Sequence, residues 1–164
     1  MHIKKISNTN QIDIVVTLAY EIWNEYFTPL IGKDQVEYML EKFQSKKAIE
    51  KQLKQGFLYF LINNDNDNFG YMGVYLKHNQ LFLSKIYIRL SERNKGYGRK
   101  AIYFIEQLAI EIGANKISLT VNKGNSDSIK AYEKFGFVTI KSVAKDIGHH
   151  FVMDDYLMEK SIKS

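Results

Sequence analysis

The chain has 164 residues, of which 45% are hydrophobic and 25% charged, as expected for one soluble globular domain with a sizeable core. It contains no cysteine, which excludes disulfides, thiolate zinc sites and a cysteine nucleophile, and its four histidines are too poorly spaced to predict a metal site. No stretch approaches the roughly 20 apolar residues of a membrane span, so we expect a cytoplasmic protein with no membrane contact.

The net charge of +5 comes from the second half of the chain. Residues 1–83 hold nine Lys and nine acidic residues, whereas residues 84–164 hold fourteen Lys or Arg against nine acids. Residues 89–100 alone carry five bases and one acid, around Gly96 and Gly98. Such a run is usually a solvated surface, but next to glycines it also suits an anionic ligand.

The first half is predicted to hold a short strand, three helices and a buried strand. In chain order, these elements cover residues 2–6, 9–27, 36–43, 48–53 and 57–62. Thr9 and Asn10 are N-cap candidates for the first helix, and Pro29 and Gly32 interrupt the chain after it.

The second half is predicted to hold a hairpin and then alternating helices and strands. In chain order, these elements cover residues 69–77, 81–88, 97–112, 116–121, 126–135, 137–143 and 151–158. Gly113 and Gly136 stop the two helices. No repeat or linker divides the chain, so the order predicts a mixed α/β fold around one sheet.

The stretch "GYGRKA" matches the dinucleotide fingerprint G-x-G-x-x-G/A, but its surroundings do not. Seven residues separate Ile88, at the end of the preceding strand, from Gly96, and the next strand ends in "LTVNKGN" without an acid for the ribose. What remains is a glycine-rich helix start, whose N–H groups and dipole favour an anion such as a pyrophosphate.

The pattern Arg93-x-x-Gly96-x-Gly98, between the strand "SKIYI" and a long helix, resembles the acetyl-CoA-binding motif of the GCN5-related N-acetyltransferases. A second segment, "LTVNKGNSDSIKAYEKFGF", resembles that family's next element: a strand, an asparagine, a helix with a tyrosine, then Gly-Phe. The matching places hold Asn125, Tyr132, Gly136 and Phe137. The two motifs together cover residues 81–137.

The resemblance implies one N-acetyltransferase domain over residues 1–164, with a central, mostly antiparallel sheet and helices on both faces. Acceptor-side helices are expected at about 9–56 and the acetyl-CoA-binding core at about 81–137. The implied reaction moves the acetyl group of acetyl-CoA, a co-substrate, directly to a primary amine, without a metal or a covalent enzyme intermediate.

The same resemblance assigns the site residues. The main chain of Ile86 is expected to face the acetyl oxygen and that of Ile88 to pair with the pantetheine arm. Main-chain N–H groups of the loop are expected to wrap the pyrophosphate, through Arg93, Asn94, Lys95, Gly96, Tyr97, Gly98 and Arg99. Asn125 is a further cofactor residue, and Tyr132 is the expected general acid toward the departing thiolate.

Some of these residues also suit purely structural roles. Ile129, Tyr132 and Phe135 recur at helical core spacing, and asparagine is a good N-cap at position 125. The general base stays open, because Lys85 replaces a carboxylate in the strand before the loop. The candidates are Glu25, Asp154, Asp155, His149, His150 and a water chain.

The segments "EIWNEYF" and "GHHFVMDDYLMEK" are similar to bacterial polyamine (spermine/spermidine-type) N-acetyltransferases. A polycation needs carboxylates, and Glu21, Glu25, Asp154 and Asp155 could supply them. Trp23, Tyr26 and Phe27 could add cation–π surface, although Trp23 and Phe27 also fit a core face. The acceptor-site candidates are Glu25, Tyr26 and Asp154.

Other functions stay open. A peptide or protein N-acetyltransferase, an aminoglycoside acceptor and a non-catalytic acyl-CoA sensor all fit the same cofactor half. Nucleic acid is not expected as a partner, because the aromatic residues follow core patterns rather than lying among the bases. The protein is expected to be a monomer or a homodimer.

Overall fold

The computed structural model describes residues 1–163. Its helices are α1 (Thr9–Tyr26), α2 (Thr28–Ile31), α3 (Lys33–Met39), the π-helix η1 (Leu40–Gln44), α4 (Lys46–Lys54), the 3₁₀ turn η2 (Leu90–Glu92), α5 (Tyr97–Glu111) and α6 (Ser126–Lys134). Its strands are β1 (His2–Lys5), β2 (Leu58–Asn63), β3 (Asn68–Lys77), β4 (Gln80–Ile88), β5 (Lys116–Asn122), β6 (Val138–Gly148) and β7 (Phe151–Ser161).

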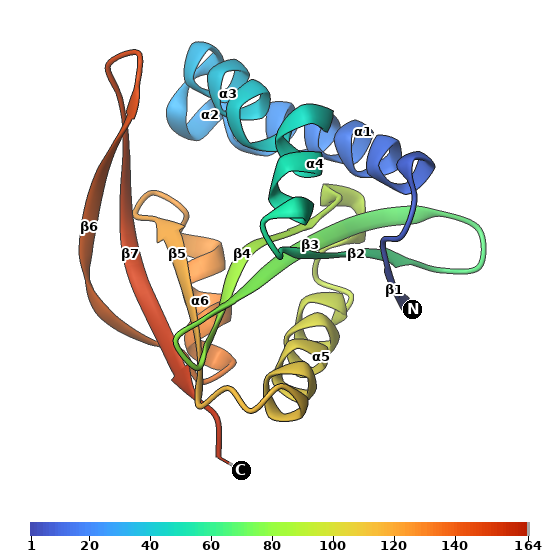
Figure 1. The fold of residues 1–164 in the computed structure, drawn as a ribbon. Coiled ribbons are helices and arrows are strands. Elements are labelled where there is room, and N and C mark those ends of the chain that lie inside the picture. Colours follow the sequence, from blue (N-terminus) through green and yellow to red (C-terminus); the bar gives the residue numbers. More distant parts are fainter. Residues whose placement is uncertain (164) are drawn as a thin grey trace. The chain divides into compact units, whose positions relative to one another are not determined.

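The seven strands form one sheet in the order β1-β2-β3-β4-β5-β7-β6 (Figure 1). β1 and β2, β2 and β3, β5 and β7, and β6 and β7 pair antiparallel. β4 and β5 pair in parallel, from Gln80 with Lys116 to Phe82 with Ser118. The sheet therefore has the mixed, mostly antiparallel character that the sequence predicts.

The chain forms two compact units. Unit 1 consists of residues Met1–Tyr75 and Ser84–Ala101, and unit 2 consists of Leu76–Leu83 and the residues from Ile102 onward. The chain passes between the units within β3, within β4 and within α5. The glycine-basic loop belongs to unit 1, whereas the segment with Asn125 and Tyr132 belongs to unit 2.

The start of α1 differs slightly from the prediction. Asn8, rather than Thr9 or Asn10, is the N-cap: its Oδ1 accepts from the N–H of Gln11 at 3.0 Å, and the Gln11 side chain accepts from the N–H of Asn8 at 3.2 Å. These reciprocal bonds satisfy two donors of the helix start, which explains why the N-cap lies one residue before the first predicted candidate, Thr9.

The segment after α1 also differs from the prediction. The expected interruption at Pro29 and Gly32 contains the short helix α2, because proline is tolerated in the first turn of a helix. The predicted helix over 36–43 is split into α3 and the π-helix η1. A π-helix leaves no mark on hydrophobic spacing, so the sequence could not reveal it.

A buried polar cluster joins the helices of unit 1 to the sheet. The amino group of Lys85, on β4, donates to the carbonyl oxygen of Phe43 at 2.7 Å and to Oε1 of Gln52 at 2.9 Å, and it bonds the hydroxyl of Tyr59. On β3, the Tyr71 hydroxyl donates to Oε1 of Gln44 at 2.9 Å. Lys85 is 5% exposed, and burial lowers its pKa to about 7.

β3 approaches β4 very closely near the end of β4. A Cβ atom on Gly70 would lie 2.7 Å from the carbonyl oxygen of Tyr87 and 3.3 Å from Cγ1 of Ile88. A side chain here would push the two backbones apart, so glycine is required for this spacing. Gly70 therefore helps to fix the position of Tyr87 and Ile88.

In unit 2, β6 and β7 form a hairpin that is longer than predicted at both strands (Figure 1). Its exposed outer strand β6 lacks the strong alternation on which strand prediction depends. On β7, Lys160 bonds Glu106 of α5 and donates to the carbonyl oxygen of Phe135 at 2.6 Å. These contacts place α5 and the end of α6 on the Lys160 face of β7.

Lys85 makes the stability of the protein depend on pH. Its pKa is about 7 in the folded protein, against about 10.4 in an unfolded chain, so the unfolded state binds more protons between these values. Folding stability should therefore rise from pH 7 to pH 9, by at most about 1.4 kcal/mol per pH unit. Urea denaturation at pH 7, 8 and 9 measures this slope, and Lys85→Met should flatten it.

Lys54→Met provides the matched control, because Lys54 is an exposed lysine in the last turn of α4. This variant should keep the wild-type slope. An unchanged slope in Lys85→Met would show that Lys85 is not the group that titrates.

Candidate active site

The loop between β4 and α5 has the backbone shape of an anion site. Asn94 and Gly96 have positive φ angles of 61° and 82°, and α5 then starts at Tyr97. The N–H groups of Tyr97 and Gly98 lie in the first turn of a 15-residue helix, before any helical carbonyl can accept from them. Donors in this position, at the positive end of the helix dipole, favour a bound anion.

The ring of Tyr97 is used for packing. It lies 4.8 Å from the ring of Phe69 on β3, measured between centroids. Phe69 is fully buried, so this contact anchors the first residue of α5 to the sheet of unit 1. The side chain of Tyr97 therefore holds the helix start in place, while its N–H stays in the first turn.

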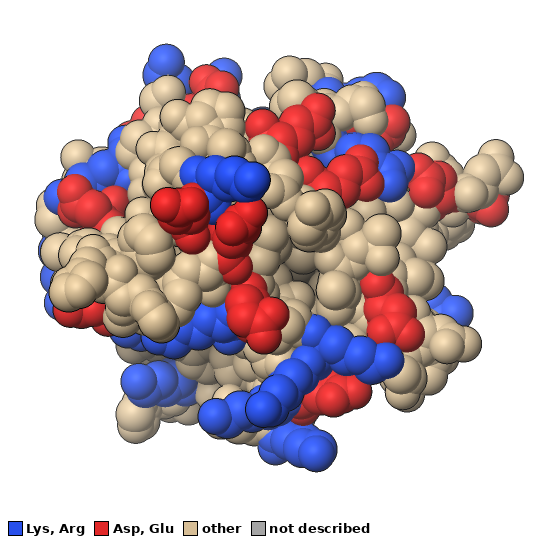
Figure 2. Space-filling view, turned by 90° about the horizontal axis from the view of Figure 1, so that it is seen from above, with Lys and Arg blue, Asp and Glu red and all other residues tan. Residues whose placement is uncertain are grey.

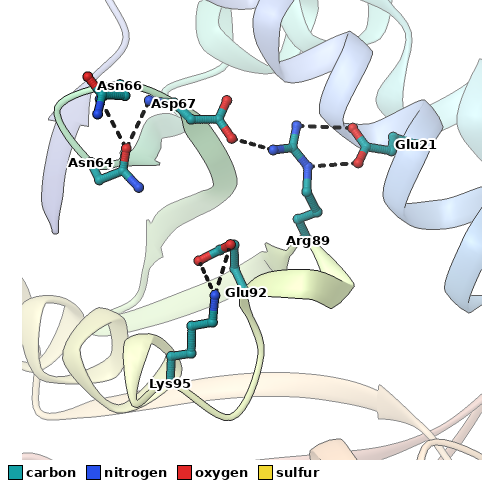
Figure 3. Close-up of polar contacts among 7 residues, drawn as sticks. All are labelled: Glu21, Asn64, Asn66, Asp67, Arg89, Glu92 and Lys95. Carbon is teal, nitrogen blue, oxygen red and sulfur yellow. Dashed lines mark hydrogen bonds and ion pairs between the residues drawn. The ribbon is translucent and has the colours of Figure 1, made fainter.

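Two of the five bases in this region are already paired (Figure 3). Arg89 forms ion pairs with Glu21 of α1, at 2.7 Å, and with Asp67 in the β2–β3 loop. Lys95 pairs with Glu92 at 3.1 Å. The charges of Arg89 and Lys95 are thus largely compensated within the protein.

Arg93 is held within the loop and against α1. Its Nε donates to the carbonyl oxygen of Ile88 at 3.0 Å, and its guanidinium lies 4.0 Å from the centroid of the Tyr26 ring. Its main-chain N–H donates to the carbonyl oxygen of Leu90 at 3.2 Å. The N–H of Arg93 is therefore engaged.

The end of β4 carries Ile86 and Ile88, which are both half-buried. They lie beyond the three residue pairs that join β4 to β5 in parallel. The carbonyl of Ile88 already accepts from Arg93. The expected use of these two main chains by a ligand is tested by no contact in the structure and stays a prediction.

The second predicted motif lies in unit 2. Asn125 is buried and caps α6: its Oδ1 accepts from the N–H of Ser128 at 3.3 Å. Tyr132 is half-buried, with its ring 5.6 Å from that of Phe137. Both residues thus have the structural roles that the sequence allows.

Asp154 and Asp155 have different surroundings because β7 alternates its faces. Asp154 is exposed and pairs with Lys123 at 2.8 Å. Asp155 is buried, and burial together with the charge of the nearby Asp154 raises its pKa to about 6. A hydrogen bond from Thr120 lowers this pKa but does not cancel the increase. A carboxyl with this pKa is ionised at neutral pH and is able to accept a proton.

The acceptor-site candidates on α1 have unequal surroundings. Glu25 is exposed and has no ion pair among residues 1–163, whereas Glu21 pairs with Arg89. Trp23 and Phe27 are buried at 3% and 8% exposure, so they are core residues. One face of Tyr26 carries the Arg93 guanidinium. Trp23, Phe27 and one face of Tyr26 are thus not available to a ligand cation.

Figure 2 shows acidic and basic side chains interspersed on the face seen from above. This mixture differs from the basic stripe with interleaved aromatics that nucleic-acid binders present. Within residues 1–163, no cluster of three or more His, Asp or Glu side chains has a geometry that could hold a metal ion. The helices of the same part of the chain include none that could span a membrane.

Several solved structures are similar to this fold. The PaiA N-acetyltransferase of Thermoplasma acidophilum, in complex with coenzyme A, has a TM-score of 0.79 and 19% identity over 98% of this chain and 99% of that chain. The ribosomal-protein-S18-alanine N-acetyltransferase of Escherichia coli has a TM-score of 0.71 and 16% identity, over 99% of this chain and 94% of that chain. A chimera of the spermidine N-acetyltransferase of Vibrio cholerae has a TM-score of 0.73 and 15% identity, over 98% of this chain and 94% of that chain.

The model of the acetyltransferase (GNAT) family matches residues 16–137 of this sequence. The matched region is far more than half of the chain, and it contains both the glycine-basic loop and the segment with Asn125 and Tyr132. The chain therefore belongs to the acetyltransferase (GNAT) family and is an acetyl-CoA-dependent N-acetyltransferase.

Proposed function

We propose that this enzyme acetylates a primary amine of a small molecule and that the first turn of α5 binds the pyrophosphate of acetyl-CoA. The observation that carries the proposal is the positive φ of Gly96 directly before the N–H groups of Tyr97 and Gly98. A pyrophosphate has the negative charge that main-chain donors at a helix N-terminus favour. The structural likeness to an N-acetyltransferase in complex with coenzyme A supports the same donor.

Acetyl transfer itself needs few groups. The nitrogen of the neutral amine attacks the thioester carbonyl, the C–N bond forms as the C–S bond breaks, and the amine gives up a proton. The carbonyl oxygen becomes anionic on the way, and a main-chain N–H at this point stabilises it. We assign this donor to Ile86, on the part of β4 that its pairing with β5 does not cover.

Tyr132 is the proposed general acid. Its hydroxyl gives a proton to the departing thiolate, and this transfer depends on placement because a phenol near pKa 10 is a weaker acid than a thiol near pKa 8.5. Packing against Phe137 and the capped start of α6 give the ring a defined position. The proton that the amine loses has an ionised acceptor in this unit, the carboxylate of Asp155.

A small amine with little charge fits the acceptor-side residues better than a polycation. Of the carboxylates considered for a polyamine, Glu21 and Asp154 are paired with basic residues, and Asp155 is buried. Glu25 is the exposed carboxylate that has no ion pair among the described residues. The fold is shared by enzymes named for spermidine and for an alanine of a ribosomal protein, at similar identity, so the likeness favours neither acceptor.

The role of the α5 N–H groups can be tested at position 97. Proline is tolerated as the first residue of a helix but has no N–H, so Tyr97→Pro removes both the ring and the donor, whereas Tyr97→Ala removes the ring alone. A hydrogen bond to a charged group contributes about 1.5–3 kcal/mol, so coenzyme A should bind the proline variant roughly 10-fold to 100-fold more weakly than the alanine variant.

Calorimetric titration with coenzyme A measures this difference, and pantetheine, which lacks the pyrophosphate, is the control ligand. Equal affinities of the two variants for coenzyme A would contradict the proposed pyrophosphate site. NAD should bind neither variant nor the wild-type protein.

Replacement of Tyr132 tests the general acid. Tyr132→Phe keeps the ring that packs on Phe137 but removes the proton donor, so kcat should fall by roughly 10²-fold to 10⁴-fold. The affinity for acetyl-CoA should stay close to that of the wild-type protein. Turnover is measured by thiol release, and an unchanged kcat would exclude this role for Tyr132.

A panel of amines tests the acceptor class by the same thiol assay. Small monoamines should be turned over more efficiently than spermidine, and both more efficiently than a peptide with a free N-terminus. Glu25→Gln should lower kcat/KM for spermidine by roughly 2-fold to 5-fold, as expected for one exposed charge pair. Glu37→Gln, an exposed carboxylate of α3, is the control. Turnover of the peptide alone would contradict the proposal.

A further inference from the structure

Arg93 connects three parts of unit 1. Its Nε donates to the carbonyl oxygen of Ile88, the last residue of β4, at 3.0 Å. The central carbon of its guanidinium lies over the ring of Tyr26, the last residue of α1, at 4.0 Å from the ring centroid. Its own backbone belongs to the loop that precedes α5. One half-buried side chain thus touches the acceptor-side helix, the strand end and the cofactor loop.

These contacts use one edge and one face of the guanidinium. A bidentate phosphate contact needs an edge of the guanidinium to be free and able to turn. Here the Nε is used by a carbonyl, one face is covered by an aromatic ring, and the main-chain N–H bonds Leu90. The edge of the Arg93 guanidinium that contains Nε is therefore engaged within the protein.

The same region is tied together by two further sets of contacts. Arg89, four residues earlier, pairs with Glu21 of α1 and with Asp67 of the β2–β3 loop (Figure 3). In addition, the centroid of the Tyr87 ring, on β4, lies 5.3 Å from the ring centroid of Trp23 and 5.8 Å from that of Phe27. The end of α1 and the end of β4 thus form one packed assembly, and Arg93 is its connection to the loop.

We propose that Arg93 is a positioning residue, which fixes the Ile88 end of β4 and the last turn of α1 so that donor and acceptor sites form together. The proposal rests on the proposed use of the Ile88 main chain by the pantetheine arm. Loss of Arg93 then disturbs the site where pantetheine binds, although pantetheine carries no phosphate. It also loosens the α1 turn next to Glu25.

The decisive comparison uses coenzyme A and pantetheine as ligands, by calorimetric titration. If Arg93 acts by positioning, Arg93→Gln weakens both ligands by a similar factor, roughly 5-fold to 30-fold. Arg93→Lys keeps the positive charge but loses the Nε donor and the planar stack, so it should behave like Arg93→Gln. If Arg93 instead binds phosphate, coenzyme A alone is weakened and lysine largely restores its affinity. That result would overturn the proposal.

Tyr26 supplies an independent test from the other side of the contact. Tyr26→Phe keeps the ring and should bind coenzyme A like the wild-type protein, whereas Tyr26→Leu should weaken it although α1 carries no proposed cofactor residue. In a Tyr26→Leu background, Arg93→Gln should have a smaller effect than in the wild-type background. Fully additive effects of the two changes would contradict the connection.

Hydrogen exchange measures the connection between the coenzyme A site and the end of α1, and it needs no amine substrate. The N–H of Phe27, which donates to the carbonyl oxygen of Trp23, reports on the last turn of α1, and the N–H of Leu30, which donates to that of Phe27, reports on the junction with α2. Saturating coenzyme A should slow their exchange in the wild-type protein and not in Arg93→Gln. Equal slowing in both proteins would overturn the proposal. Failure of the wild-type protein to bind coenzyme A at all would instead refute the proposed donor site.

Discussion

The contact between the Lys85 amino group and the Phe43 carbonyl determines how the helices of unit 1 meet the sheet. This carbonyl lies in the π-helix η1, where the helical hydrogen-bond pattern changes, and it also accepts from Nε2 of Gln52 at 3.1 Å. Lys85 is adjacent to Ile86 on β4. The bond between Lys85 and η1 therefore also helps to position the strand segment proposed to bind the acetyl group. This lysine on β4 thus acts as a structural anchor.

A second consequence follows for the electrostatics of the loop. The sequence concentrates bases there, yet Arg89 and Lys95 are ion-paired and Arg93 is stacked on Tyr26. These three cations shape the loop and connect it to α1 and β4, in line with the proposal that the main-chain donors of α5 bind the anion. Gly96 adopts a positive φ directly before these donors, a conformation that glycine reaches without strain.

Much of this arrangement follows from the sequence, for identifiable reasons. The helix start at Tyr97 and the cap at Asn125 were predictable because glycine, asparagine and hydrophobic spacing act locally. The partners of Arg89 and Arg93 were not, since they lie up to 68 positions away in the chain. The same limit applies to Asp155: neighbouring aspartates in a strand point to opposite faces, and the sequence alone does not show which face is buried.

The central claim is that main-chain N–H groups at the start of α5 bind the pyrophosphate of acetyl-CoA. The most direct measurement is a titration of the ¹⁵N-labelled protein with coenzyme A, followed by the amide resonances of Gly96, Tyr97 and Gly98. The account predicts that these three resonances shift strongly, and more than the amide of the exposed Lys141 on β6. Saturating binding that leaves these three resonances unchanged would contradict it.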